Sequence, residues 1–96
     1  FLIWDQFWYE NDLISSENLA EAFQQVTLND GSISDYGFGW LITSEHSTWH
    51  NGSWLGARTM IARDTERKSC IVLLDNSLNF AFDKISSQLL KIEKNE

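Results

Sequence analysis

The stretch WHNGSWLGARTMIARD, Trp49–Asp64, places one histidine, two glycines and two tryptophans beside a segment that reads as a β-strand. The imidazole of His50 can donate a hydrogen bond, or carry a positive charge when it is protonated. A core strand has no need of so much glycine and polarity in one place. The stretch is therefore a binding turn, part of an active site, or a tight hairpin.

Other arrangements of reactive residues are weaker. Ser47 and His50, with Asp75 as a third partner, offer the residue types of a hydrolytic triad. Positions three apart on a strand point to opposite faces, which argues against that triad. Cys70 is the one cysteine, and the chain has two histidines, so we expect no disulfide and no metal site.

Apolar spacing predicts the element order helix, helix, strands, helix. Residues three and four apart indicate helices in segments 1–10, 16–26 and 78–96. Ser15 or Ser16 is placed to cap the second helix, and the turn residues of LNDGS follow it. The predicted strands are 36–42, one through Trp49 and His50, 58–64 and 69–76.

The connections between these strands are short, which requires antiparallel pairing. The predicted fold class is α+β, an antiparallel sheet of three to four strands with packed N-terminal and C-terminal helices. The run Ile71–Leu74 is apolar on both faces and predicts a central strand. Gly37 and Gly39 predict a face that a helix approaches closely. The opposite stripe, predicted to lie in the core, is Tyr36, Phe38, Trp40 and Ile42.

Length and charge narrow the function classes. A chain of 96 residues with 43% hydrophobic residues is one packed domain or part of one. The net charge is −7, and residues 1–57 contain eight acidic residues and no Lys or Arg. This acidity argues against nucleic acid and anionic membrane surfaces as partners. No apolar run approaches the roughly 18 residues of a membrane span.

Several segments together resemble the C-terminal part of the serine β-lactamase-like family. They are YGFGW at 36–40, HNGSWLGARTMIARD at 50–64, and IVLLDN at 71–76 followed by an amphipathic helix. The segment at 4–23 is similar to the helical region that precedes the Tyr-Gly-x-Gly-Trp strand in these proteins. The family includes class C β-lactamases, penicillin-binding DD-peptidases, D-aminopeptidases and esterases. The resemblance implies a β-lactamase/transpeptidase-like fold.

The resemblance also implies roles for the opening stretch. His50-Asn51-Gly52 matches the Lys-Thr-Gly or His-x-Gly motif, and Ser53 matches the residue whose backbone N–H helps to form the oxyanion hole. Gly52 would let a substrate lie against the strand. The candidate catalytic residues are His50 and Ser53, and the candidate substrate-binding residues are Asn51, Gly52, Trp54 and Gly56.

The nucleophile of the family is missing. No serine in residues 1–96 has a lysine three positions later, and Tyr36 is not followed by the Tyr-x-Asn motif. Without a nucleophile and a base, this chain should be inactive alone. The chain also starts inside an apolar pattern. We therefore expect residues 1–96 to be a single C-terminal fragment of a larger serine hydrolase domain, with the upstream part of the same protein as its partner.

The expected reaction is hydrolysis of an amide, an ester or a β-lactam in a small-molecule or peptide substrate through an acyl-enzyme. This reaction implies no metal and no organic cofactor. The resemblance implies a periplasmic or extracellular location. It does not separate lactamase, peptidase and esterase. The alternative is a non-catalytic module whose acidic, tryptophan-rich surface binds a peptide, a glycan or a partner chain.

Overall fold

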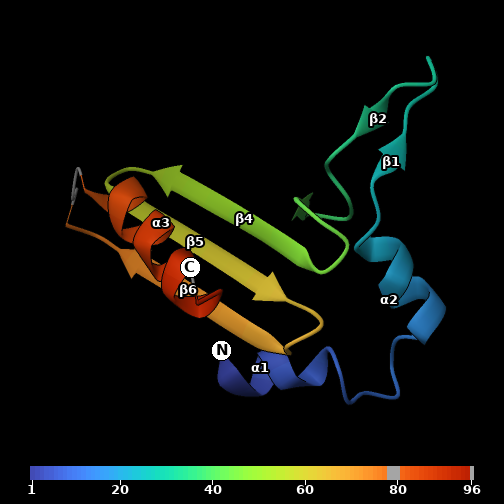
Figure 1. Ribbon diagram of the computed structural model, residues 1–96, viewed down its shortest axis with the longest axis horizontal. Coiled ribbons are helices and arrows are strands. Elements are labelled where there is room, and N and C mark those ends of the chain that lie inside the picture. Colours follow the sequence, from blue (N-terminus) through green and yellow to red (C-terminus); the bar gives the residue numbers. More distant parts are fainter. Residues whose placement is uncertain (78–80, 96) are drawn as a thin grey trace.

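Helices flank an antiparallel sheet in the computed structural model, which describes residues 1–77 and 81–95 (Figure 1). The sheet has the strand order β3-β4-β5-β6, and β1 and β2 form a separate two-stranded hairpin. The predicted α+β class with antiparallel strands is confirmed. The elements are α1 (Leu2–Phe7), α2 (Ser16–Ala22), β1 (Val26–Thr27), β2 (Ile33–Ser34), β3 (Leu41–Ile42), β4 (Ser47–Trp54), β5 (Ala57–Asp64), β6 (Ser69–Asp75) and α3 (Phe82–Glu93).

Strands β4 and β5 form the longest pairing of the sheet. Their register runs from Ser47 opposite Asp64 to Trp54 opposite Ala57, which leaves a loop of two residues. Both loop residues have positive φ, 44° at Leu55 and 88° at Gly56. This is the backbone of a type I′ turn, whose twist matches that of the flanking strands. The two strands are therefore held in one register.

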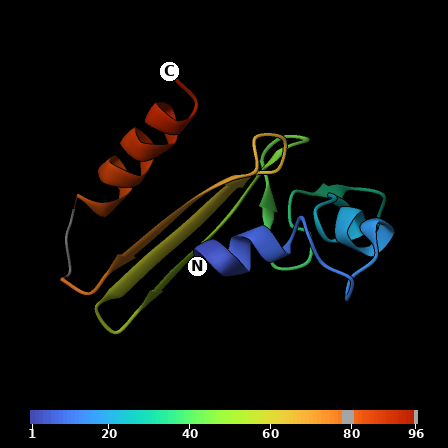
Figure 2. The same ribbon diagram turned by 90° about the horizontal axis from the view of Figure 1, so that it is seen from below.

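Helix α3 covers one face of the sheet (Figure 2). Phe82 at its start packs on Met60 and Ala62 of β5, and all three side chains are buried. Ser15 caps α2 as expected, because its hydroxyl accepts a hydrogen bond from the Asn18 N–H. The partly buried residues that surround the α3 cluster are Trp49, Ile71, Leu73 and Leu90.

The opposite face of the sheet carries a buried ion pair with α1. Side chains alternate along β5, so Arg63 points away from Met60 and Ala62. Its Nε and Nη2 atoms lie 2.7 and 2.6 Å from Oδ1 of Asp5. The guanidinium also lies 5.1 to 5.3 Å from the ring centres of three tryptophans. These rings, which favour a cation on their faces, belong to Trp4, Trp8 and Trp40.

Two titratable side chains lie near this ion pair. Burial raises the pKa of Tyr9 to about 12, because the phenolate would lose its hydration. Burial also raises the pKa of the Cys70 thiol, and the negative charge of Asp5 adds to this effect. The thiolate is the reactive form of cysteine, so this environment disfavours a nucleophilic Cys70.

The second predicted helix ends earlier than its apolar spacing suggests. The prediction over 16–26 is wrong beyond Ala22, and Val26 belongs to β1. The carbonyl oxygen of Ala22 accepts a hydrogen bond from the Phe38 N–H at 3.1 Å, so a distant segment competes for this helix end. The hairpin of β1 and β2 then projects away from the four-stranded sheet (Figure 1).

The predicted strand over 36–42 is also mostly wrong. Only Leu41 and Ile42 form a strand, and Tyr36 returns to Leu41 through an isolated bridge. Gly39 has a φ of 80°, which produces this turn and breaks the alternation of faces. Of the expected core stripe, Trp40 and Ile42 are buried, whereas Tyr36 and Phe38 are 42% and 61% exposed.

Of the two glycines in this turn, Gly37 has the close backbone neighbour that we expected. A Cβ on Gly37 would lie 2.6 Å from the carbonyl oxygen of Ala22 and 2.9 Å from that of Gln24. At Gly39 a Cβ would have no neighbour within 4 Å, so the expectation of a close contact is wrong there. Gly39 serves the turn, and Gly37 serves the packing against the end of α2.

Two further predictions need correction. Strand β6 lies at the end of the described strand order and is not central. Its run is apolar on both faces because α3 covers one face and the ion-pair region of α1 lies on the other. On α3, Phe82 and Leu90 contact the core while Ile92 of the expected stripe is 71% exposed. Leu78, also in that stripe, lies outside the described residues.

Candidate functional site

The candidate site lies on the second half of β4. All residues from His50 to Trp54 are exposed, in contrast to Thr48, which is 3% exposed. The backbone is extended throughout this segment and ends in the turn at Leu55 and Gly56. The five residues are therefore accessible on a rigid strand.

One backbone edge of this segment has no strand paired to it among residues 1–77 and 81–95. The backbone of His46 points toward β5, because its carbonyl oxygen accepts a hydrogen bond from the Thr65 N–H at 2.8 Å. The backbone of the next residue, Ser47, points toward β3, because its carbonyl oxygen accepts a hydrogen bond from the Thr43 N–H at 3.0 Å. The N–H and C=O groups of successive residues point to alternate sides of a strand. Those of Asn51 and Ser53 therefore point away from β5, as those of Ser47 do. In the described register, β3 pairs with β4 at Thr48 and Trp49 and does not extend opposite Asn51 or Ser53.

The side chains of the segment divide between the two faces of the sheet. Asn51 lines a cleft beside α3, and Ser53, two residues later, shares that face. His50, Gly52 and Trp54 belong to the opposite face. The side chains of the two candidate catalytic residues, His50 and Ser53, therefore point to opposite faces of β4. What Ser53 offers at the edge is its backbone N–H.

Gly52 is constrained by the neighbouring strand. It pairs with Thr59 of β5, and a Cβ on Gly52 would lie 2.8 Å from Oγ1 of Thr59. Trp54 is 78% exposed at the end of the strand, on the same face as Gly52. Gly56, another candidate binding residue, lies in the two-residue turn, where its positive φ already requires glycine.

His50 has a partner that the sequence did not indicate. The hydroxyl of Tyr36 lies 2.7 Å from its Nε2 atom, and the two ring centres are 5.9 Å apart. Strand alternation from residue 36 to residue 42 predicts a core position for Tyr36, whereas the structure leaves this side chain 42% exposed. The combination of Gly37 and Gly39 was the available signal for a turn that would free this side chain.

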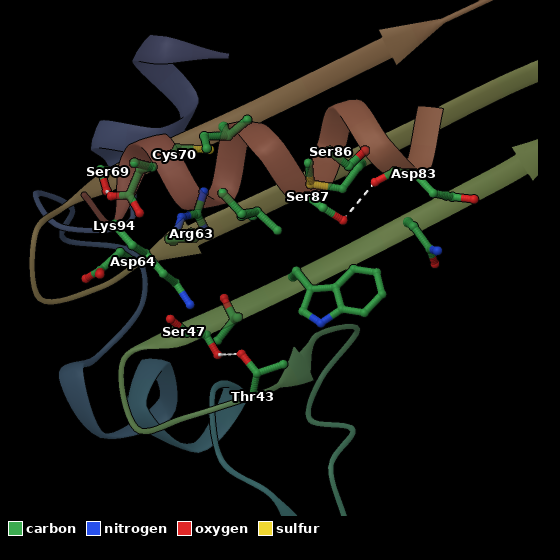
Figure 3. Close-up of a pocket in the computed structure, with 18 of the residues that line it drawn as sticks. Thr43, Ser47, Arg63, Asp64, Ser69, Cys70, Asp83, Ser86, Ser87 and Lys94 are labelled. Carbon is green, nitrogen blue, oxygen red and sulfur yellow. Dashed lines mark hydrogen bonds between the residues drawn. The ribbon is translucent and has the colours of Figure 1, made fainter. Parts of the chain in front are cut away.

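The cleft that Asn51 lines has a volume of about 400 Å³ and lies between α3 and the sheet (Figure 3). Ser86 and Ser87 of α3 line it, and their hydroxyls donate to the carbonyl oxygens of Phe82 and Asp83 at 2.8 Å. These hydroxyls are occupied by the backbone of their own helix. Ser47, also at the cleft, accepts through its carbonyl oxygen from the Thr43 hydroxyl at 3.1 Å (Figure 3).

Within residues 1–77 and 81–95, no three His, Cys, Asp or Glu side chains come together as a possible metal site. Within the same ranges, no helix has the length and apolar character needed to cross a bilayer.

Comparison with known proteins identifies a penicillin-binding protein to which this chain is similar. Penicillin-binding protein 4* of Bacillus subtilis (strain 168) is 36% identical over 76 residues. The match covers 75% of this chain and 17% of the relative. This similarity supports a relationship to the penicillin-binding and β-lactamase-like proteins. No family model matches the chain, and no solved structure gives a significant match.

The match also relates this chain to a much larger protein. The chain spans about one sixth of the length of the penicillin-binding protein that it matches. Most of the relative's length therefore has no counterpart in these residues.

Proposed function

We propose that this chain is the C-terminal part of a β-lactamase-like serine hydrolase and supplies one wall of its acyl-enzyme site. The observation that carries the proposal is the exposed segment His50–Trp54, with an open backbone edge, in a chain similar to a penicillin-binding protein. In this function a serine outside these residues attacks an amide, ester or β-lactam carbonyl, and water later releases the acyl group.

The edge of β4 suits the charge that develops in that reaction. Attack on the carbonyl places negative charge on its oxygen, and a fixed backbone N–H stabilises this charge without reorganisation. The N–H of Ser53 turns away from β5, and pairing with β5 along eight residues holds it in place. Ser53 thus supplies an oxyanion donor, which agrees with the role that the sequence resemblance implies.

The side chains around this edge have complementary tasks. His50 donates a hydrogen bond to a substrate carboxylate or carbonyl. Gly52 leaves the strand surface clear between His50 and Trp54, and the exposed Trp54 ring offers an apolar surface to a substrate. Asn51 faces the α3 side, so its contribution to binding is made by its backbone at the open edge.

The test is covalent labelling of the full-length protein that contains these residues. Fluorescent penicillin, a fluorogenic ester and a D-amino-acid peptide represent the three substrate classes. We expect an adduct on a serine in a Ser-x-x-Lys sequence upstream of Phe1, located by mass spectrometry. The isolated 96-residue chain should form no adduct. Labelling of a serine within residues 1–96, or no reaction with any of the probes, would contradict the proposal.

A further inference from the structure

The Tyr36–His50 hydrogen bond is held in place by the surrounding backbone. Gly37, next to Tyr36, donates its N–H to the carbonyl of Trp40 at 2.7 Å. Trp40 is buried, and its ring contacts those of Trp8 and Phe23. The turn that carries Tyr36 is therefore anchored in the core while the phenol remains exposed.

The pairing of Tyr36 with Leu41 fixes the turn along the edge of β3 that faces away from β4. Tyr36 bridges to Leu41, and Leu41 in turn pairs with Trp49. Strand β3 therefore lies between the backbone of Tyr36 and that of β4, and the Tyr36 side chain reaches across to His50. The backbone N–H of Tyr36 is also bound, by Oγ of Ser34 at 3.2 Å. The backbone around Tyr36 is therefore held by hydrogen bonds, and the Tyr36 hydroxyl lies within hydrogen-bond distance of His50.

A hydrogen bond at one ring nitrogen determines where a neutral imidazole carries its proton. A neutral histidine has one N–H and one nitrogen lone pair, and the partner of one nitrogen selects the tautomer. A phenol hydroxyl is a better donor than an imidazole N–H, and an imidazole nitrogen is a better acceptor than a phenol oxygen. The arrangement O–H···Nε2 is therefore preferred at the 2.7 Å contact between Tyr36 and His50.

We propose that Tyr36 is a positioning residue that holds neutral His50 in the Nδ1–H tautomer. Tyr36 then occupies Nε2 and fixes the ring, so that Nδ1–H is the ring donor available to a substrate oxygen. This use of the donor rests on the proposed hydrolase function. The tautomer itself follows from the contact and can be measured without substrate.

The experiment is ¹⁵N NMR of the full-length protein labelled at histidine, at a pH of about 8.5, well above the ordinary pKa of about 6.5 for histidine. The His50 signals are assigned by their loss in His50→Gln. We expect a protonated Nδ1 and an unprotonated, hydrogen-bonded Nε2 in the wild-type protein. In Tyr36→Phe the proton should redistribute toward Nε2. Tyr9→Phe, which removes the other tyrosine hydroxyl of this chain, should change nothing at His50.

A wild-type His50 protonated at Nε2 overturns the proposal even if no variant folds, and so does a folded Tyr36→Phe protein with an unchanged tautomer. The rate at which the full-length protein is acylated provides a second test of the role of Tyr36. Tyr36→Phe removes one hydrogen bond to His50, and we expect it to lower kcat/KM by about tenfold. If Nδ1–H is found but no probe acylates the protein, the hydrolase function fails while the Tyr36 assignment stands.

Discussion

Gly52 and Thr59 face each other across β4 and β5 so closely that a Cβ on Gly52 would lie 2.8 Å from the Thr59 Oγ1. Thr59 is β-branched and has few alternative rotamers. We expect Gly52→Ala to lower the free energy of unfolding by about 1 kcal/mol or more through overpacking. Thr59→Ala in the same chain should restore most of this loss, measured by urea unfolding.

The same double variant separates packing from substrate binding. If Gly52 also keeps the strand surface clear for a substrate, Gly52→Ala with Thr59→Ala will be stable and still acylate slowly. Gly37→Ala provides a comparison in which no second substitution can relieve the overlap. Its Cβ would lie 2.6 and 2.9 Å from backbone carbonyl oxygens, which cannot rotate away, so we expect Gly37→Ala to lower the free energy of unfolding. A Gly37→Ala variant as stable as the wild type would contradict the geometry of this turn.

The buried Asp5–Arg63 pair should dominate the electrostatic contribution to stability. Removing one partner leaves an uncompensated charge, so Asp5→Asn should cost about 3–5 kcal/mol in urea unfolding. The comparison pair is Arg58–Asp83, at 2.7 Å but with an Asp83 side chain that is 82% exposed. Asp83→Asn should cost less than about 1 kcal/mol. If Asp5→Asn and Asp83→Asn lowered the free energy of unfolding equally, burial would not be the reason that the Asp5–Arg63 pair matters.

The turn between β4 and β5 contains a residue in an unfavourable conformation. Leu55 has a φ of 44° and is 92% exposed, so its side chain gives little packing in return. Asn tolerates this conformation, and Asn-Gly is the preferred pair in type I′ turns. Leu55→Asn should raise the free energy of unfolding by roughly 0.5–1 kcal/mol. Leu55→Val should lower it, and a stabilising Val would contradict the assigned turn.

Tyr9 should make stability depend on pH in the alkaline range. Burial raises its pKa to about 12, against an ordinary value of 10.0. Above pH 10 the unfolded chain loses this proton first, so the stability that Tyr9 provides is present below pH 10 and is lost as the pH rises toward 12. Tyr9→Phe should make the fall in Tm between pH 10 and 12 shallower. The absorbance of ionised tyrosine provides the direct titration.

The strands 58–64 and 69–76, the cap at Ser15 and the α+β class follow from local patterns, because alternation, turn residues and capping act over a few positions. The predicted elements that differ from the structure are those whose bounds depend on contacts between segments far apart in the sequence. The end of α2 depends on the contact of Ala22 with Gly37 and Phe38, which are far away in the sequence. The face that α3 turns to the sheet likewise depends on how its partner strands are arranged.

The candidate site was predictable in part. The segment His50–Ser53 could be recognised from its residue types and from the resemblance, and the structure places it on an exposed strand. The contact of Tyr36 with His50 was not recognised, because the turn at Gly39 removes Tyr36 from the face that alternation gives it. The split of His50 and Ser53 between two faces follows from strand alternation once the strand is established.

The most direct test of the central claim is the acylation rate of the full-length protein carrying Ser53→Pro, compared with Ser53→Ala. Proline removes the backbone N–H at a position that turns away from β5, whereas alanine removes only the hydroxyl. We predict that Ser53→Ala reacts with fluorescent penicillin or ester at the wild-type rate and that Ser53→Pro reacts roughly 100-fold more slowly. A Ser53→Pro protein that is folded by circular dichroism and acylates at the wild-type rate would contradict the account.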